Sequence, residues 1–173
     1  MPLHPPHSAP DLDAVSLFRS EMPPGAIPAE ALALAENIAG ASPFLRQLML
    51  RDPGFAGRVF IETADGLLAE QLGLLRDLDP GLSQAEVMAR LRQAKKRVAL
   101  LIAVADLSCA WNVEQVTAAL TDFADAALGA AISWLLSDYA RQGKVTLPDA
   151  GAPLVYCGYV ALAMGKQGAH ELN

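Results

Sequence analysis

The 173-residue sequence has few of the side chains that build disulfide frameworks or metal centres, since it contains only two cysteines and three histidines. Disulfide-rich secreted folds and structural zinc sites need more of these residues, at closer spacing. We therefore expect no metal-binding constellation. Cys109 and Cys157 are predicted to be small apolar fillers in a reducing compartment.

Long hydrophobic runs are also lacking. The longest uninterrupted apolar run, Val98 to Ala105, has eight residues and is followed by Asp106, whereas a membrane-spanning helix needs about 20. The N-terminus has neither the basic start nor the apolar core of a secretory signal. We therefore expect a cytoplasmic protein that does not contact a membrane.

The sequence is poor in positive charge. Its 13 basic residues are outnumbered by 19 acidic ones, which gives a net charge of -6 at pH 7 and a pI near 4.9. No overall field therefore draws the chain toward nucleic acid or an anionic membrane. Neither is an expected partner.

The apolar residues that are present make up 53% of the chain, which is enough for one ordinary domain with a core. Seven of the 12 prolines fall in residues 1–28, and proline fixes its own backbone and removes a hydrogen-bond donor. We therefore predict an irregular proline-rich lead-in over residues 1–27. Helical periodicity then predicts a helical domain over residues 28–146.

Start and stop signals divide this helical domain. Ser42–Pro43 marks the start of a short helix, and a break is predicted near Asp65–Gly66. Ser83 and Glu86 have the spacing of a capping box, in which each side chain satisfies a free amide of the other residue. They are therefore predicted to begin a long helix. A further long helix is predicted from Asn112 to Gly143.

The last part of the chain, residues 147–173, has a different character. β-forming residues over 154–164 predict a strand, and Gly165-Lys166-Gln167-Gly168 predicts a glycine turn after it. The turn is not a Walker A loop, because Val160 stands where that motif needs glycine and Gln167 replaces its hydroxyl residue. It is either a place where bare amides and a lysine contact phosphate, or a plain strand-to-helix turn.

The same residues carry a resemblance to a known family. The string GKQGAHELN, at the end of the chain, resembles GKLGGRELN of the bifunctional glutamine synthetase adenylyltransferase/adenylyl-removing enzymes. Gln167 replaces an apolar residue, Ala169 replaces a glycine, and His170 replaces an arginine or aromatic residue. A weaker likeness upstream extends the resemblance over most of residues 40–173. The six matching positions are Gly165, Lys166, Gly168, Glu171, Leu172 and Asn173.

The resemblance implies a fold and a site. The expected fold is mainly α: a helical bundle, then a strand and glycine turn that begin a polymerase-β-like nucleotidyltransferase domain in residues 147–173. Gly165, Lys166 and Gly168 would form the turn that approaches the phosphate of a nucleotide. The family's metal-binding Asp-x-Asp pair would follow residue 173, so this domain would be incomplete. We therefore expect no catalytic residue and no metal ligand in the chain.

By the same resemblance, the chain is an N-terminal fragment of an enzyme that regulates nitrogen metabolism. That enzyme removes AMP from a tyrosine of glutamine synthetase by phosphorolysis, and its second half attaches AMP from ATP. The longer enzyme would use Mg²⁺ and adenine nucleotide, and it would respond to a PII-type signalling protein. The fragment itself is expected to be inactive and to bind no cofactor tightly. The alternative is a stand-alone helical protein-interaction module without catalysis.

A cluster of positive charge lies on the helix predicted to begin at Ser83. Stepped around that helix, the cations spread over the side away from the apolar stripe, as a solvated face does. The second interpretation is a contact with glutamine synthetase or with the absent domain. The residues of this basic cluster are Arg90, Arg92, Lys95, Lys96 and Arg97.

Overall fold

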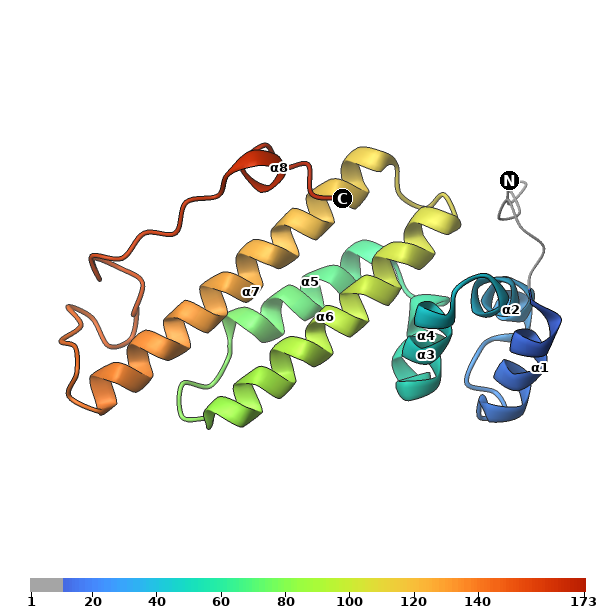
Figure 1. Cartoon of the computed structure of the whole chain (residues 1–173), viewed down its shortest axis with the longest axis horizontal. Helices are drawn as coiled ribbons and strands as arrows, with labels where there is room; N and C mark the ends of the chain where they lie inside the picture. Colours follow the sequence, from blue (N-terminus) through green and yellow to red (C-terminus); the bar gives the residue numbers. More distant parts are fainter. Residues whose placement is uncertain (1–10) are drawn as a thin grey trace. The chain divides into compact units, whose positions relative to one another are not determined.

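The computed structural model describes residues 11–173, and these residues are mainly helical, as predicted (Figure 1). No β-strand occurs among them. In chain order the elements are α1 (Leu12–Glu21), the 3-10 helix η1 (Ala29–Ala31), α2 (Leu32–Ala41), α3 (Pro43–Arg51), α4 (Pro53–Val59), α5 (Ala64–Arg76), α6 (Gln84–Leu107), α7 (Val113–Arg141) and the short α8 (Gly165–Gly168).

The chain divides into two compact units. The first unit consists of the chain up to Leu67 together with Lys96–Asn112, and the second consists of Leu68–Lys95 together with Val113–Asn173. Both α5 and α6 therefore contribute residues to each unit. The domains expected from the sequence are continuous residue ranges with limits at residues 28 and 146, whereas each of these units combines separate parts of the chain. The expected limits therefore stay a prediction.

Helix α1 corrects one expectation. The irregular lead-in predicted over residues 1–27 is wrong for α1, while residues 1–10 lie outside the described part of the chain. Residues 11–22 contain no proline, so their backbone is free to make helical hydrogen bonds. Asp11 begins the helix, because its Oδ1 accepts two amide hydrogen bonds from the first turn, at 3.0 and 3.2 Å.

The first unit has a fully buried apolar core. Phe18 of α1, Met49 of α3 and Leu101 of α6 expose at most 1% of their surface. The helices around this core are capped: Ser42 Oγ and Asp52 Oδ1 each accept a 3.2 Å hydrogen bond from an amide in the first turn of α3 and α4, respectively. The start predicted at Ser42 is therefore confirmed.

The break predicted near Asp65–Gly66 is wrong by a few residues. Helix α4 ends at Val59 and α5 begins at Ala64, so the Asp-Gly pair lies in the first turn of α5. Oγ1 of Thr63 accepts a 3.3 Å hydrogen bond from the amide of Gly66, which is the arrangement of an N-cap. Thr63, rather than the Asp-Gly pair, therefore sets the boundary.

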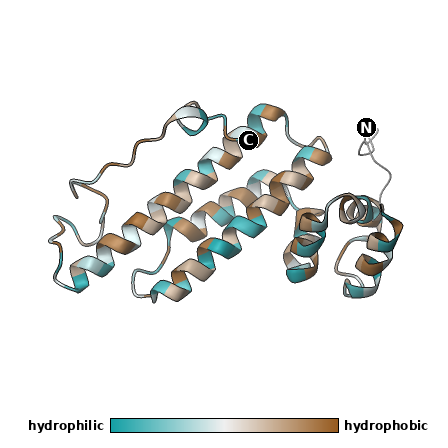
Figure 2. Ribbon diagram, viewed as in Figure 1, coloured by the Kyte–Doolittle hydropathy of each residue, from teal (hydrophilic) through white to brown (hydrophobic). Residues whose placement is uncertain are grey.

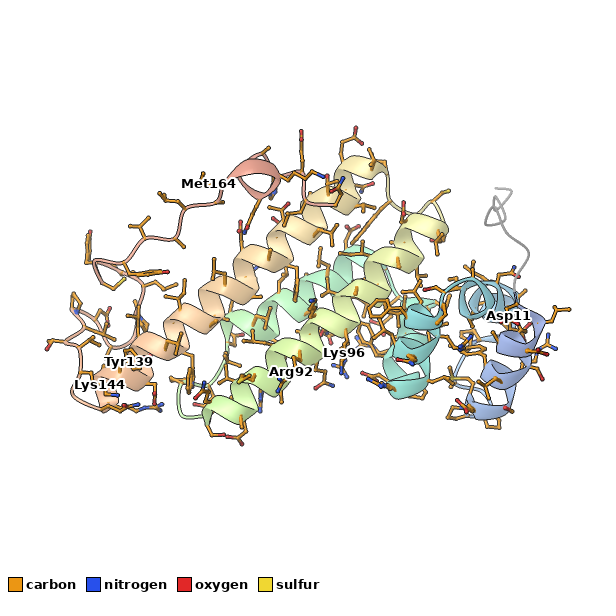
Figure 3. The ribbon with its side chains drawn as sticks, in the orientation of Figure 1. Asp11, Arg92, Lys96, Tyr139, Lys144 and Met164 are labelled. Carbon is orange, nitrogen blue, oxygen red and sulfur yellow. The ribbon has the colours of Figure 1, made fainter. Side chains whose placement is uncertain are left out.

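One cation of the basic cluster is used inside the first unit. Nε of Arg97 donates to Oδ2 of Asp52 at 2.8 Å, and the guanidinium lies 5.0 Å from the centroid of the Phe55 ring. The other four cations are exposed, and Arg92 and Lys96 lie one turn apart on α6 (Figure 3). Those four fit the solvated-face interpretation, whereas Arg97 holds α6 to α4.

An ion pair between α1 and α2 makes stability depend on pH. Arg19 donates to both carboxylate oxygens of Glu36, at 2.5 and 2.6 Å, and Glu36 is buried. The hydrogen bond from Arg19 lowers the pKa of Glu36 below its ordinary 4.5, against the opposing effect of burial. A lowered carboxylate pKa contributes stability above the ordinary value, and this contribution is lost as pH falls through the lowered pKa.

We therefore expect Glu36→Gln to destabilise the fold at neutral pH and to have little effect in strong acid. Urea unfolding followed by circular dichroism over a series of pH values measures the difference between the variant and the wild type. Glu30→Gln, on the exposed turn η1, is the matched control. A difference that stays constant into strong acid contradicts the assignment to the Arg19–Glu36 pair.

Three helices pack together in the second unit. Apolar side chains of α5, α6 and α7 form one cluster around Leu75, Ala94 and Ala130.

The capping box predicted at Ser83 is confirmed, because its amide donates to Oε2 of Glu86 at 2.8 Å and the Glu86 amide donates to Ser83 Oγ at 3.4 Å. Hydrogen bonds from the Ser83 hydroxyl and amide lower the pKa of Glu86.

Helix α7 is anchored to the loop that precedes α6. Trp134 is 6% exposed, and its Nε1 donates to the carbonyl oxygen of Leu82 at 3.0 Å. At the last residue of the same helix, Arg141 donates to the carbonyl oxygen of Pro80 at 2.5 Å. These two bonds hold the loop against the C-terminal half of α7.

Helix α7 confirms the long helix predicted after Asn112 and has 29 residues. Among residues 11–173 it alone is long and apolar enough to cross a membrane, with a mean hydropathy of 1.3 over its most apolar window. A single helix of this kind is weak evidence for a membrane span, since core helices of soluble proteins can be equally long and apolar.

The chain after α7 folds back along that helix (Figure 1). Residues 142–164 consist of turns, bends and irregular backbone, so the strand predicted over 154–164 does not form. A strand must pair its backbone groups with a neighbour, and no other described residue is in a strand. Figure 2 shows the stretch as largely hydrophobic, and Leu162 and Met164 are each 82% exposed.

Both cysteines are free thiols. The prediction of an apolar filler is wrong for Cys109, which is exposed in the turn after α6 and has a left-handed backbone with φ of 54°. Cys157 is partly buried in the C-terminal segment, where its Sγ lies 3.4 Å from the carbonyl oxygen of Leu154. Neither thiol lies in the core.

Candidate functional site

The predicted glycine turn is a single helical turn, α8, in the second unit. Gly165 opens it with a left-handed backbone, φ of 59°, which glycine adopts without strain. Gly168 closes it where a side chain does not fit, because a Cβ there would lie 2.7 Å from the carbonyl oxygen of Ala163. The turn therefore needs both glycines, one for its dihedral angle and one for a close backbone approach.

Lys166 lies on the outer side of this turn. Its side chain is exposed, and Nζ donates to Oδ1 of Asn173 at 2.5 Å. The amide of Glu171 donates to the carbonyl oxygen of Lys166 at 2.8 Å. These bonds fold the last residues back onto the turn. The ammonium thus sits at the surface, where an anion can reach it.

Two side chains that flank the turn bind acidic residues of α7. Nε2 of Gln167 donates to Oδ1 of Asp125 at 2.7 Å. Nε2 of His170 lies 3.3 Å from Oδ1 of Asp122, and both side chains are about half exposed. The turn is therefore attached to the middle of a long helix rather than standing free.

A third contact lies deeper, at Thr121 of α7. Thr121 is 1% exposed, and its Oγ1 donates to the carbonyl oxygen of Thr117 at 2.9 Å. The same oxygen accepts a 3.4 Å hydrogen bond from the amide of Leu172. These partners on α7 have no distinctive signal in the sequence. The available signal, two acidic residues three positions apart on an apolar helix, is equally typical of a solvated face.

A cavity of about 370 Å³ adjoins these contacts, between α7 and the C-terminal segment. Its walls are mostly apolar and include Leu128 and Ile132 of α7 and Leu162 of the segment. Asp125 and Gln167 are polar groups of its lining, and no basic side chain lines it. The cavity itself is therefore a poor phosphate site, and the exposed outer side of the turn is the better one.

The residues beside the turn do not fit magnesium. Among residues 11–173, no group of three or more His, Cys, Asp or Glu is placed to hold a metal ion. Magnesium demands octahedral coordination by oxygen, whereas Asp122 and Asp125 already bond to side chains of the C-terminal segment. The turn fits a phosphate better, since it has an exposed ammonium and glycines that leave its backbone bare.

Comparison with known proteins decides the family. The family model described as glutamate-ammonia ligase adenylyltransferase matches residues 32–173, which include every described helix from α2 to α8. The chain belongs to this family.

Curated members of the adenylyltransferase family are much longer than this chain. The bifunctional glutamine synthetase adenylyltransferase/adenylyl-removing enzyme of Xanthobacter autotrophicus is 44% identical over 143 residues, which are 83% of this chain and 14% of that protein. Enzymes of the same name from Brucella suis and Rhizobium meliloti are 40% and 41% identical over 134 and 138 residues. The chain spans 14% of the length of each of these relatives. No solved structure matches it.

Proposed function

We propose that this chain is the N-terminal part of an enzyme that regulates glutamine synthetase by removing AMP from a tyrosine, and whose second half adds AMP there. The observation that carries the proposal is the family match, which runs through the GKQGAHELN segment. The 14% share of its relatives' length supports a partial enzyme. The names of those relatives join both activities in one protein.

In this proposal the turn of Gly165, Lys166 and Gly168 binds and orients the phosphate. A phosphate oxygen attacks the adenylyl phosphorus, and the bond from that phosphorus to the tyrosine oxygen breaks. The tyrosine oxygen is the leaving group and takes up the proton that the attacking phosphate gives up, so the products are ADP and free tyrosine. Lys166 contributes a positive charge at the turn, and the two glycines keep the backbone open to the anion. The role of the chain is therefore to bind and align a substrate rather than to move a proton.

Magnesium would neutralise phosphate charge in this reaction. Since the described residues offer it no carboxylate cluster, we assign its ligands to the part of the enzyme outside this chain. The chain alone is accordingly proposed to be inactive and to bind adenine nucleotide weakly. We place the longer enzyme in the cytoplasm, with glutamine synthetase and a PII-type signalling protein as partners.

The first test is phosphorolytic release of ADP from adenylylated glutamine synthetase. This chain is compared with a protein extended through the downstream coding sequence, with magnesium, phosphate and a PII-type protein supplied. Activity is expected only in the extended protein. Activity in the 173-residue chain contradicts its proposed inactivity. Inactivity of both proteins, when both are folded, favours a helical protein-interaction module.

Lys166→Ala in the extended protein tests the phosphate site itself. We expect the KM for phosphate to rise about tenfold, because a charge-assisted contact to an anion contributes roughly 1.5 kcal/mol. Lys144→Ala is the matched control, since Lys144 is also an exposed lysine and lies over the Tyr139 ring at 5.2 Å, outside the turn (Figure 3). Equal phosphate KM values in the two variants contradict the role given to Lys166.

A further inference from the structure

We propose that Asp122 and Asp125 of α7 are positioning residues for the glycine turn, which they hold through His170 and Gln167. The inference deepens the proposed function and rests on it, because the place of the turn matters to the reaction only if Lys166 binds phosphate there. It extends the site from a terminal turn to the middle of a helix in the second unit.

The contacts between the turn and α7 follow a register. Asp122 and Asp125 lie three residues apart, and residues at this spacing share a face of a helix. Their partners are also three residues apart, and they pair in the opposite chain direction. A third contact continues in the same direction, so the segment's direction along α7 is set as well as its place. The pairs are 167 with 125, 170 with 122, and 172 with 121.

The backbone beside the turn needs support from outside it. His170 has a left-handed backbone with φ of 62°, which a residue with a Cβ adopts only at a cost in free energy. Its imidazole meets Asp122, and the next contact along the chain joins Leu172 to Thr121. The partners on α7 therefore stabilise a conformation that the last residues do not favour by themselves.

The contacts to α7 determine the position of Lys166. This residue precedes Gln167, whose Nε2 donates to Oδ1 of Asp125 at 2.7 Å, so this bond limits how far the backbone beside Lys166 can move. Its carbonyl oxygen accepts from the amide of Glu171, next to His170. Loss of the contacts to α7 therefore lets the ammonium move away from a bound phosphate.

Positioning can be separated from folding at these residues. Asp122 and His170 are about half exposed, and exposed ion pairs contribute little to overall stability. The buried cluster of the three helices involves neither residue. Removing the two carboxylates should therefore loosen the turn and leave α7 and its packing intact.

The first experiment measures backbone order by NMR in the 173-residue chain. In Asp122→Ala/Asp125→Ala, the order parameters of amides 166–172 are expected to fall from about 0.85 to below about 0.6. Asp122→Asn/Asp125→Asn keeps an acceptor oxygen at each position and should keep the order. Asp138→Ala removes another carboxylate of α7, bound to Arg141 and Gln142, and should also leave the turn ordered. Unchanged order in the alanine variant overturns the proposal.

The second experiment measures phosphate KM and kcat in the extended protein. The alanine pair should raise KM about tenfold with kcat nearly unchanged, and the asparagine pair should restore KM. A merely structural role would lower the apparent kcat in proportion to the loss of folded enzyme and would leave KM unchanged. A loosened turn with an unchanged KM overturns the positioning role. Failure of Lys166→Ala to change KM overturns the phosphate site instead, so the two failures are distinguishable.

Discussion

Replacing Trp134 with alanine is expected to lower the free energy of unfolding by about 3 to 5 kcal/mol. The indole is 6% exposed, and its Nε1 holds the carbonyl oxygen of Leu82 at 3.0 Å. The substitution therefore empties a large buried volume and also leaves a carbonyl group without its donor. Urea unfolding followed by far-ultraviolet circular dichroism measures the effect without relying on tryptophan fluorescence.

The control for this substitution is Trp134→Phe. Phenylalanine keeps an aromatic ring in the site but cannot donate to Leu82, so it should cost about 1 to 2 kcal/mol. The difference between the two variants separates the packing of the ring from its hydrogen bond. A loss below about 1 kcal/mol in the alanine variant would mean that Trp134 does not anchor α7 to the loop before α6.

Gly57→Ala is expected to destabilise the first unit by about 2 to 3 kcal/mol. Gly57 lies in α4, where a Cβ would clash with the carbonyl oxygen of Ala26. That contact is with backbone, which cannot swing aside as a flexible side chain can. Either α4 or the loop containing Ala26 must shift. The free energy of unfolding from urea denaturation measures the cost.

Gly54→Ala is the matched control for Gly57→Ala, because it makes the same chemical change in the same helix. A Cβ at Gly54 would meet nothing within 4 Å, and alanine is the better helix former. This variant should be neutral or stabilised by up to about 1 kcal/mol. Equal effects of the two substitutions would contradict the close approach of α4 to Ala26.

Local signals in the sequence are enough to predict much of the helical part. Ser42 and Ser83 each accept a hydrogen bond from an amide three residues away, and both helix starts are where these caps predict. The predicted start of α5 is misplaced, because the Asp-Gly pair is a stronger turn signal in the sequence than the single capping residue Thr63 that precedes it. Helix α1 is missed because the surrounding prolines dominate the composition there.

Features that depend on distant residues are harder to predict. The β-forming residues of 154–164 do not make a strand, because strand pairing needs a neighbouring strand that the described residues lack. The glycine turn is predictable from Gly165 and Gly168 alone, since both requirements are local. Its attachment to Asp122 and Asp125 is not, because about 40 residues separate the partners and only the folded chain brings them together.

The exposed segment after α7 has a consequence for how the protein behaves in solution. Between Asp149 and Lys166 no residue carries a charge, and Val160, Leu162 and Met164 are more than 70% exposed. Uncharged, β-forming stretches of this kind promote aggregation unless charged gatekeeper residues interrupt them. Lys166 is the gatekeeper at one end of this stretch. Its removal should therefore lower the concentration at which the protein precipitates, whatever it does to phosphate.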